Sequence, residues 1–221
     1  MAIRYSLSAA LFSLCLFRLC LLAATPAQQT WTFDSVSRIS GYAATVLGHP
    51  HSIATPAGRA IEFNGVDDAI FLDVHPLAGA ETWTWEVIFR PDADGAAEQR
   101  FFHLQENGTE NRMLFEIRLI GNQWCLDSFA KSGADSLALM DRAKLHPAGA
   151  WYHAAAVYDG HEFRNYVDGV LQGKGALHLS PQNAGAASIG VRFNKVNYFK
   201  GAIRMARMTP RALPVSEFLK K

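Results

Sequence analysis

Two Asp-Gly dipeptides, Asp159-Gly160 and Asp168-Gly169, constrain the fold of this chain more than any other sequence feature. Asp and Gly tolerate the positive φ angles that tight turns between strands require, so each dipeptide predicts a turn. The segments beside these turns, within residues 151–169, are rich in Tyr, Val and Phe, which favour β-strands. Strand, turn, strand and turn in close succession predict an antiparallel meander.

Alternating apolar and polar residues predict strands elsewhere. In residues 82–90, one face would carry Trp83, Trp85, Val87 and Phe89, and residues 112–120 alternate in the same way. Other expected strands span residues 31–34, 59–63, 69–72, 99–106, 123–130, 136–140, 186–193 and 197–207. We expect a long surface loop at 35–58, with one weak strand near 43–47, and a short helix or turn at 210–221. About a dozen short strands predict an all-β, two-sheet antiparallel jelly-roll sandwich.

Size and charge limit the classes of function. The chain has 221 residues, of which 49% are hydrophobic, and this is enough for one well-buried domain, expected at residues 28–221. The formal net charge is +1, and the Lys and Arg residues do not cluster along the sequence. Nucleic acid is therefore not an expected partner.

The N-terminus differs in character from the rest. Residues 1–27 carry Arg4 and Arg18 but no acidic residue, and they are largely apolar. This composition predicts a secretory signal peptide, and hence a secreted or extracytoplasmic protein. Because Arg18 interrupts the apolar stretch, an alternative is that residues 1–24 remain as a membrane anchor. Removal of the signal would leave Cys125 as the one cysteine, so stability must come from the core rather than from disulfides.

The order of several motifs resembles the laminin G-like jelly-roll domains of the concanavalin A-like lectin/glucanase superfamily. The motifs are Trp31-Thr32-Phe33-Asp34, the turn Phe63-Asn64-Gly65-Val66-Asp67-Asp68, the hairpin from Trp151-Tyr152-His153 to Tyr166-Val167-Asp168-Gly169, and the ending from Phe199-Lys200-Gly201-Ala202-Ile203 to Arg211-Ala212-Leu213. The resemblance implies two antiparallel sheets, one of them concave, and a binding or adhesion module for glycans or proteins. The same superfamily also includes glycosidases.

Calcium at one edge of the sandwich is also implied by the resemblance. The candidate ligands are the carboxylates of Asp34, Asp67 and Asp68, which are hard oxygen donors of the kind that Ca²⁺ prefers. This sequence departs from the family pattern at Arg204, where relatives commonly carry an acidic residue. Asp67 and Asp68 would otherwise serve only to cap a turn.

A polar strand face offers a candidate ligand site. Arg112, Glu116 and Arg118 share one face of their strand, and Asp127 is expected opposite them on the returning strand. Arg192 and Asn194 alternate on a later expected strand. If these side chains converge on the concave sheet, their arginines suit a uronate, sulfate or sialate group. The alternative is a salt-bridged, solvent-exposed face without a ligand.

Catalysis is the less favoured interpretation. Glucanases of this superfamily need paired carboxylates on one strand face, and a Glu-x-Asp-x-x-Glu motif is absent from the sequence. A lyase of acidic polysaccharides stays open as an alternative on the Arg112, Glu116 and Arg118 face. Arg112 or Arg118 would then neutralise the substrate carboxylate. The candidate base would be His103 or His153, and the candidate acid Tyr198.

The sequence therefore favours an exported, non-catalytic binding module for a glycan or an extracellular protein. A polysaccharide lyase and a purely structural exported domain remain as alternatives. Neither the ligand nor the oligomeric state is specified by any motif.

Overall fold

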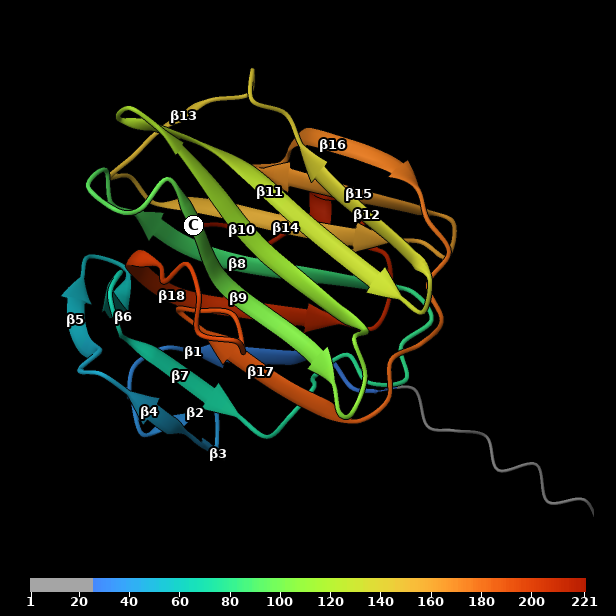
Figure 1. Cartoon of the computed structure of the whole chain (residues 1–221), viewed down its shortest axis with the longest axis horizontal. Helices are drawn as coiled ribbons and strands as arrows, with labels where there is room; N and C mark the ends of the chain where they lie inside the picture. Colours follow the sequence, from blue (N-terminus) through green and yellow to red (C-terminus); the bar gives the residue numbers. More distant parts are fainter. Residues whose placement is uncertain (1–25) are drawn as a thin grey trace, which may run out of the picture.

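Two large antiparallel sheets stack face to face in the computed structural model of this protein, which describes residues 26–221 (Figure 1). The predicted signal segment, residues 1–27, lies almost entirely outside the described residues. The two-sheet sandwich predicted from the strand pattern is confirmed. Within the described residues, no helix has the length and apolar character needed to cross a membrane.

The first sheet contains the Asp-Gly hairpins and both ends of the described chain. Its strand order is β16-β15-β14-β8-β18-β6-β5, and β1 also pairs with β18. The strands are β1 (Gln29–Thr32), β5 (His51–Thr55), β6 (Gly58–Asn64), β8 (Trp83–Pro91), β14 (Tyr152–Tyr158), β15 (Glu162–Val167), β16 (Val170–Ala176) and β18 (Lys200–Thr209).

The second sheet contains the long hairpin of residues 112–132. Its order is β12-β11-β10-β9-β17-β7-β4, and β13 pairs with β11. The strands are β4 (Thr45–Leu47), β7 (Ala69–Leu72), β9 (Glu98–Glu106), β10 (Arg112–Ile120), β11 (Gln123–Ser132), β12 (Asp135–Met140), β13 (His146–Pro147) and β17 (Gly185–Ile189). A separate small hairpin is formed by β2 (Arg38–Ile39) and β3 (Tyr42–Ala43).

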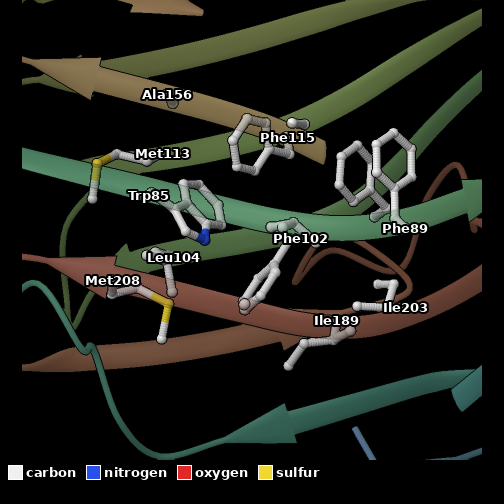
Figure 2. Packing of buried hydrophobic residues seen from close by; sticks show 14 of the residues in the cluster. Trp85, Phe89, Phe102, Leu104, Met113, Phe115, Ala156, Ile189, Ile203 and Met208 are labelled. Atoms are coloured by element: carbon white, nitrogen blue, oxygen red, sulfur yellow. The ribbon is translucent and has the colours of Figure 1, made fainter. Parts of the chain in front are cut away.

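An aromatic core fills the space between the sheets (Figure 2). Trp85 of β8 meets Phe115 of β10 with ring centroids 4.4 Å apart, and Phe89 stacks on Phe101 of β9 at 4.3 Å. The rings of β8 come from alternate positions of the strand, which is why the period of two in the sequence predicts them. Each buried aromatic side chain contributes about 1.5–3 kcal/mol by leaving water.

The Asp-Gly turns form as predicted. The Asp159 carboxylate accepts the backbone N–H groups of His161 and Glu162, at 3.0 and 2.8 Å, which closes the turn between β14 and β15. In the second turn both Asp168 and Gly169 adopt positive φ, 48° and 78°. This backbone geometry favours an Asx-Gly pair between twisted strands.

Two local predictions are wrong. Residues 35–58 are not one long loop, because they form β2, β3, β4 and β5. The expected strand at 186–193 ends at Ile189, so Arg192 and Asn194 lie in the loop between β17 and β18. The short helix or turn expected at 210–221 is present as a three-residue 3₁₀ turn, η1 (Val215–Glu217), and it is no longer because Pro214 and Phe218 on either side are both extended.

The C-terminal segment, residues 210–221, instead runs across the outer face of the first sheet. Phe218 and Leu213 pack there against Ala155 and Val157 of β14. Hydrogen bonds fix the segment, with Leu213 N–H donating to Thr84 Oγ1 at 2.8 Å and Leu219 N–H to Glu86 Oε1 at 2.7 Å. The outer face of the first sheet is thereby covered by the chain itself.

Candidate functional site

The candidate site is the outer face of β9, β10 and β11 in the second sheet, which we call the charged face. Met113, Phe115 and Ile117 of β10 point into the core, so the alternate residues Arg112, Glu116 and Arg118 point outward. On either side, Glu116 is paired in register with Asp127 of β11 and with Arg100 of β9. The structure thus places Asp127 of β11 on the same face as Glu116 of β10, as predicted.

A bulge in β9 sets the spacing of the face. The register between β9 and β10 shifts at Phe115 and Glu116, and both Phe101 and Phe102 are buried in the core. At the bulge, β9 has one residue more than β10. As a result, Arg100 and His103, on either side of the bulge, both point to the charged face.

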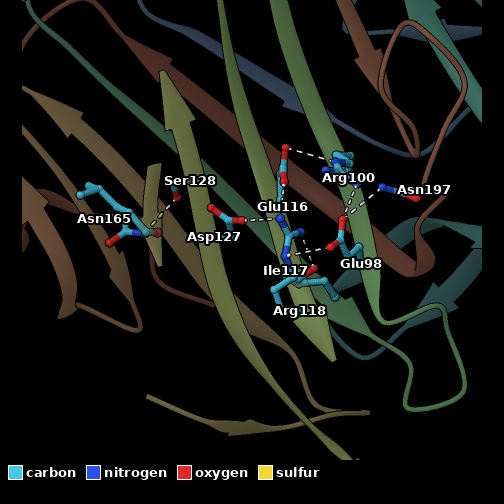
Figure 3. A network of polar contacts seen from close by, with 10 residues as sticks. Glu98, Arg100, Glu116, Ile117, Arg118, Asp127, Ser128, Asn165 and Asn197 are labelled. Atoms are coloured by element: carbon cyan, nitrogen blue, oxygen red, sulfur yellow. Dashed lines mark hydrogen bonds and ion pairs between the residues drawn. The ribbon is translucent and has the colours of Figure 1, made fainter. Parts of the chain in front are cut away.

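One end of the charged face is a compact ion-pair network, which we call the paired end (Figure 3). The Arg118 guanidinium lies 2.7 Å from the Asp127 carboxylate and 3.1 Å from that of Glu116. Arg100 reaches the other oxygen of Glu116 at 3.2 Å and also pairs with Glu98. Within this network, both arginines are paired, because three carboxylates face two cations.

Asp127 carries the most perturbed carboxylate of the paired end. Its pKa is raised to about 6, first because burial removes water from the carboxylate and second because Glu116 is a nearby negative charge. The contact with Arg118 lowers the pKa but does not outweigh those two effects. Asp127 is therefore ionised at neutral pH and becomes protonated under mildly acidic conditions.

The other end of the charged face has excess positive charge, and we call it the cationic end. Arg112 lies with its guanidinium 5.0 Å from the ring centre of Phe129, and its one acidic partner is Glu110, which is 73% exposed. Arg192 has no ion-pair partner among the described residues. Burial, followed by the charges of Arg112 and Arg100, lowers the pKa of Arg192. Two arginines at this end thus face one solvent-screened carboxylate.

His103 is buried beneath the cationic end. Its Nδ1 accepts the backbone N–H of Phe193 at 3.3 Å, and the two rings lie 4.7 Å apart. Burial, Arg192 and Arg112 together lower the pKa of His103 to about 3, so the imidazole is neutral and carries its proton on Nε2.

Several buried polar atoms of the charged face have no hydrogen-bond partner in the described part of the chain. They are Arg100 Nε, Arg112 Nε, His103 Nε2 and Asp127 Oδ1. Leaving such an atom unpaired costs about 1–3 kcal/mol, and the described structure holds further ones away from this face, at Trp85, Trp124, Arg164 and Asn165. A hollow of about 210 Å³ adjoins the cationic end, and it is lined by Gln105, Glu106, Asn107, Gly108, Ala186 and Phe193.

The other predicted site residues have different fates. Asn194 is exposed in the loop after β17 and does not join the charged face by any hydrogen bond in the described structure. His153 lies on the first sheet, where its Nε2 is 3.0 Å from Glu86, so it cannot act together with Arg112. Tyr198 is half-buried near the start of β18.

The predicted calcium ligands do not fit a metal centre. Both oxygens of Asp68 are occupied by backbone N–H groups, from His49 at 2.7 Å and Asn64 at 2.9 Å. Asp67 accepts a hydrogen bond from the Asn64 side chain at 2.7 Å, and Asp34 is exposed. Among the described residues, no group of three or more His, Cys, Asp or Glu side chains could hold a metal ion. These aspartates organise a turn.

A buried cluster on the first sheet escaped prediction. Glu86 is fully buried and accepts hydrogen bonds from Arg207 Nε at 2.6 Å and from His153 and the Leu219 N–H group. Although burial alone would raise it, these hydrogen bonds hold the pKa of Glu86 below its usual value. Alternation along the strand places Glu86 on the outer face of the sheet. Glu86 is buried because the C-terminal segment, distant in sequence, covers it.

Comparison with known proteins agrees with this architecture. Domain 4 of AbnA, an extracellular arabinanase from Geobacillus stearothermophilus, was solved in complex with arabinotriose. It is 19% identical with a TM-score of 0.58, over 85% of this chain and 94% of that one. The SAP-like pentraxin from Limulus polyphemus is 12% identical with a TM-score of 0.54, over 87% of this chain and 80% of that one.

A third similar structure is the binding domain of Paraclostridial Mosquitocidal Protein 1. It has 12% identity and a TM-score of 0.61, over 85% of this chain and 49% of that one, so this chain spans about half of it. These identities support a shared fold and nothing finer. A search of curated protein sequences found no match.

The family is settled by sequence. A family model described as the concanavalin A-like lectin/glucanases superfamily, of the laminin G type, matches residues 64–217. The match extends from the Asn64 turn, through the charged face and the Asp-Gly hairpins, to the C-terminal 3₁₀ turn. The resemblance seen in the motifs is therefore confirmed, and this chain belongs to the concanavalin A-like lectin/glucanases superfamily.

Proposed function

We propose that this protein is an exported, non-catalytic binding module that holds a glycan on its charged face. The observation that carries the proposal is the surface beside Arg112, where a hollow of about 210 Å³ is lined by Gln105, Glu106 and Phe193. A sugar presents hydroxyl groups and apolar ring faces, so it can contact guanidinium, amide and aromatic side chains on one surface. The arabinotriose complex of a structurally similar domain supports a glycan over other ligands.

Export is part of the proposal and rests on the composition of residues 1–27. The one described cysteine, Cys125, is buried and free, so the described domain holds no disulfide. Such a domain does not depend on the redox state of its surroundings.

A polysaccharide lyase is the second candidate, because His103 lies beside Arg112 and is neutral. Its chemistry meets two obstacles. The Nδ1 atom already accepts the Phe193 N–H group, and Nε2 carries the proton, so neither nitrogen is free to take a proton from a substrate. The imidazole is also fully buried.

A glycan array, followed by titration of the purified protein with the best ligand, tests the binding proposal. We expect saturable binding, and we expect the affinity for the same ligand to fall when Arg112 is replaced by Gln. Absence of binding to every glycan, combined with capture of an extracellular protein, would replace the proposal with a protein-binding role. New double-bond absorbance on incubation with uronate polymers would instead establish the lyase.

A further inference from the structure

Resting on the proposed glycan-binding function, we infer that the ligand is acidic, and that its carboxylate or sulfate group binds at the cationic end between Arg112 and Arg192. The first argument is charge balance along the charged face. At the paired end, the guanidinium of Arg118 contacts both Glu116 and Asp127. It is already occupied by carboxylates of the protein.

The cationic end lacks such compensation. Arg192 has no ion-pair or side-chain hydrogen-bond partner among the described residues, and Arg112 contacts only the exposed Glu110. Glu106 lies nearby, but its two oxygens are occupied by hydrogen bonds from Asn183, Asn111 and the Thr109 hydroxyl. Arg192 therefore lacks a direct carboxylate partner, and an anionic group of a ligand would supply one.

The second argument is preorganisation. Arg192 comes from the loop of residues 190–199, and several hydrogen bonds anchor this loop to β9. The Phe193 N–H group donates to His103 Nδ1 at 3.3 Å, and the Asn197 carbonyl accepts the Arg100 N–H group at 2.9 Å. Arg112 is held by the rigid strand β10 and by its contact with Phe129. The backbone that carries the two cations is therefore ordered before binding, which reduces the conformational entropy lost when a ligand arrives.

The third argument is the surface beside the two arginines. Phe193 and Gln105 line the adjoining hollow of about 210 Å³. An aromatic ring next to an amide is a surface that can contact the apolar face and the hydroxyl groups of a sugar ring. Charge and ring together suit an acidic sugar better than a free inorganic anion.

The test uses pairs of polymers that differ in charge alone. Polygalacturonate is compared with its methyl ester, and dextran sulfate with dextran, by calorimetric titration of the purified protein. We expect the charged member of at least one pair to bind at least tenfold more tightly than its neutral counterpart. The pair that responds identifies carboxylate or sulfate as the anionic group.

Variants connect the preference to the proposed residues. Arg192→Ala and Arg112→Gln should each weaken binding of the charged polymer roughly tenfold to hundredfold, the usual range for one charge-assisted hydrogen bond. The matched control is Arg211→Ala, which removes the same charge from an exposed side chain on the C-terminal segment. Its affinity should equal that of the wild type.

The outcomes separate this inference from the function on which it rests. Equal binding of charged and neutral members, unaffected by either variant, would overturn the acidic ligand and leave glycan binding intact. An equal loss of affinity in all three variants would show unspecific attraction of a polyanion and would also overturn the inference. Failure of every glycan to bind would overturn both.

Discussion

Each outer face of the sandwich carries buried carboxylates paired with arginines, but the two faces differ in where the hydrogen-bond partners come from. On the first sheet, buried Glu86 is surrounded by Arg207, His153 and the Leu219 N–H group, and the C-terminal segment covers the cluster. On the second sheet, Glu116 and Asp127 pair with Arg100 and Arg118, which come from strands β9 and β10 of the same sheet. The C-terminal segment thus completes the hydrogen bonding of Glu86 on the first face, whereas one oxygen of Asp127 on the second face has no hydrogen-bond partner.

This contrast separates structural charges from charges that are available for binding. A buried charge with a full set of partners contributes to a unique fold, because removing any partner is costly. A buried charge with missing partners keeps part of its interaction capacity for another molecule. The described part of the chain contains both arrangements, so substitutions in the two faces should have different consequences.

The largest effect is expected from Glu86→Ala on the covered face. The change leaves Arg207 without its buried carboxylate and the Leu219 N–H group without its acceptor, so the free energy of unfolding should fall by about 3–5 kcal/mol. Denaturant unfolding measures this loss, and Glu81→Ala at an exposed position is the control, expected within about 0.5 kcal/mol of wild type. A small loss at Glu86 would show that the C-terminal segment does not complete the first face.

Asp127→Asn should have a pH-dependent effect on the charged face. Because the folded pKa of Asp127 is about 6 and its ordinary value is 3.8, the unfolded state releases its proton first as pH rises. The wild type therefore loses stability through this group between about pH 4 and 7, whereas Asn does not titrate. The variant should gain about 2–3 kcal/mol relative to wild type across this range.

Thermal or denaturant unfolding at several pH values checks this difference. Glu116, Arg118, Arg100 and Glu98 are the ionisable groups that act on Asp127, and all of them are retained in the variant. Asp135→Asn at an exposed position is the matched control. A pH-independent difference between Asp127→Asn and wild type would contradict the raised pKa.

A smaller effect on stability is expected at the cationic end. Arg192→Ala removes a cation that has no acidic partner in the described structure and lies near Arg112 and Arg100, so stability should change by no more than about 0.5 kcal/mol. Arg118→Ala, at the paired end, should instead cost about 3 kcal/mol or more, because two buried carboxylates lose their cation. Similar losses in the two variants would erase the distinction between the two ends.

No effect at all is expected from calcium. The Asp68 carboxylate already accepts two backbone hydrogen bonds, so the turn at Asn64 is complete without a metal ion. Melting curves with excess calcium and with a chelator should coincide, because a ligand that binds only the native state must raise the midpoint. A higher midpoint with calcium would restore the site predicted at Asp34, Asp67 and Asp68.

Local sequence patterns predict the strands that later form both faces. The strand expected at residues 112–120 is β10, with the same bounds, because alternation with a period of two reports directly which side chains face a core. The Asp-Gly turns are equally local, since their φ angles depend on the residues themselves. The shared face of Arg112, Glu116, Arg118 and Asp127 follows from one hairpin register.

Features that depend on distant segments could not be predicted in this way. Glu86 is outward in its strand, and it is buried only because residues 210–221 return across it. The position of Arg192 depends on where β17 ends and on the anchoring of its loop to His103. The short strands within residues 35–58 pair with partners elsewhere in the sheets or with one another, and their Ser-, Gly- and Pro-rich composition hides them.

Mapping of backbone amide chemical shifts during titration with a galacturonate oligomer tests the central claim most directly. If the charged face is the binding site, the shifts should move at β9, β10 and β11 and in the loop that carries Arg192, with the largest changes at the cationic end. The C-terminal segment on the opposite face should stay unchanged. Shift changes confined to residues 210–221, or to the edge loops away from Arg112 and Arg192, would contradict the claim.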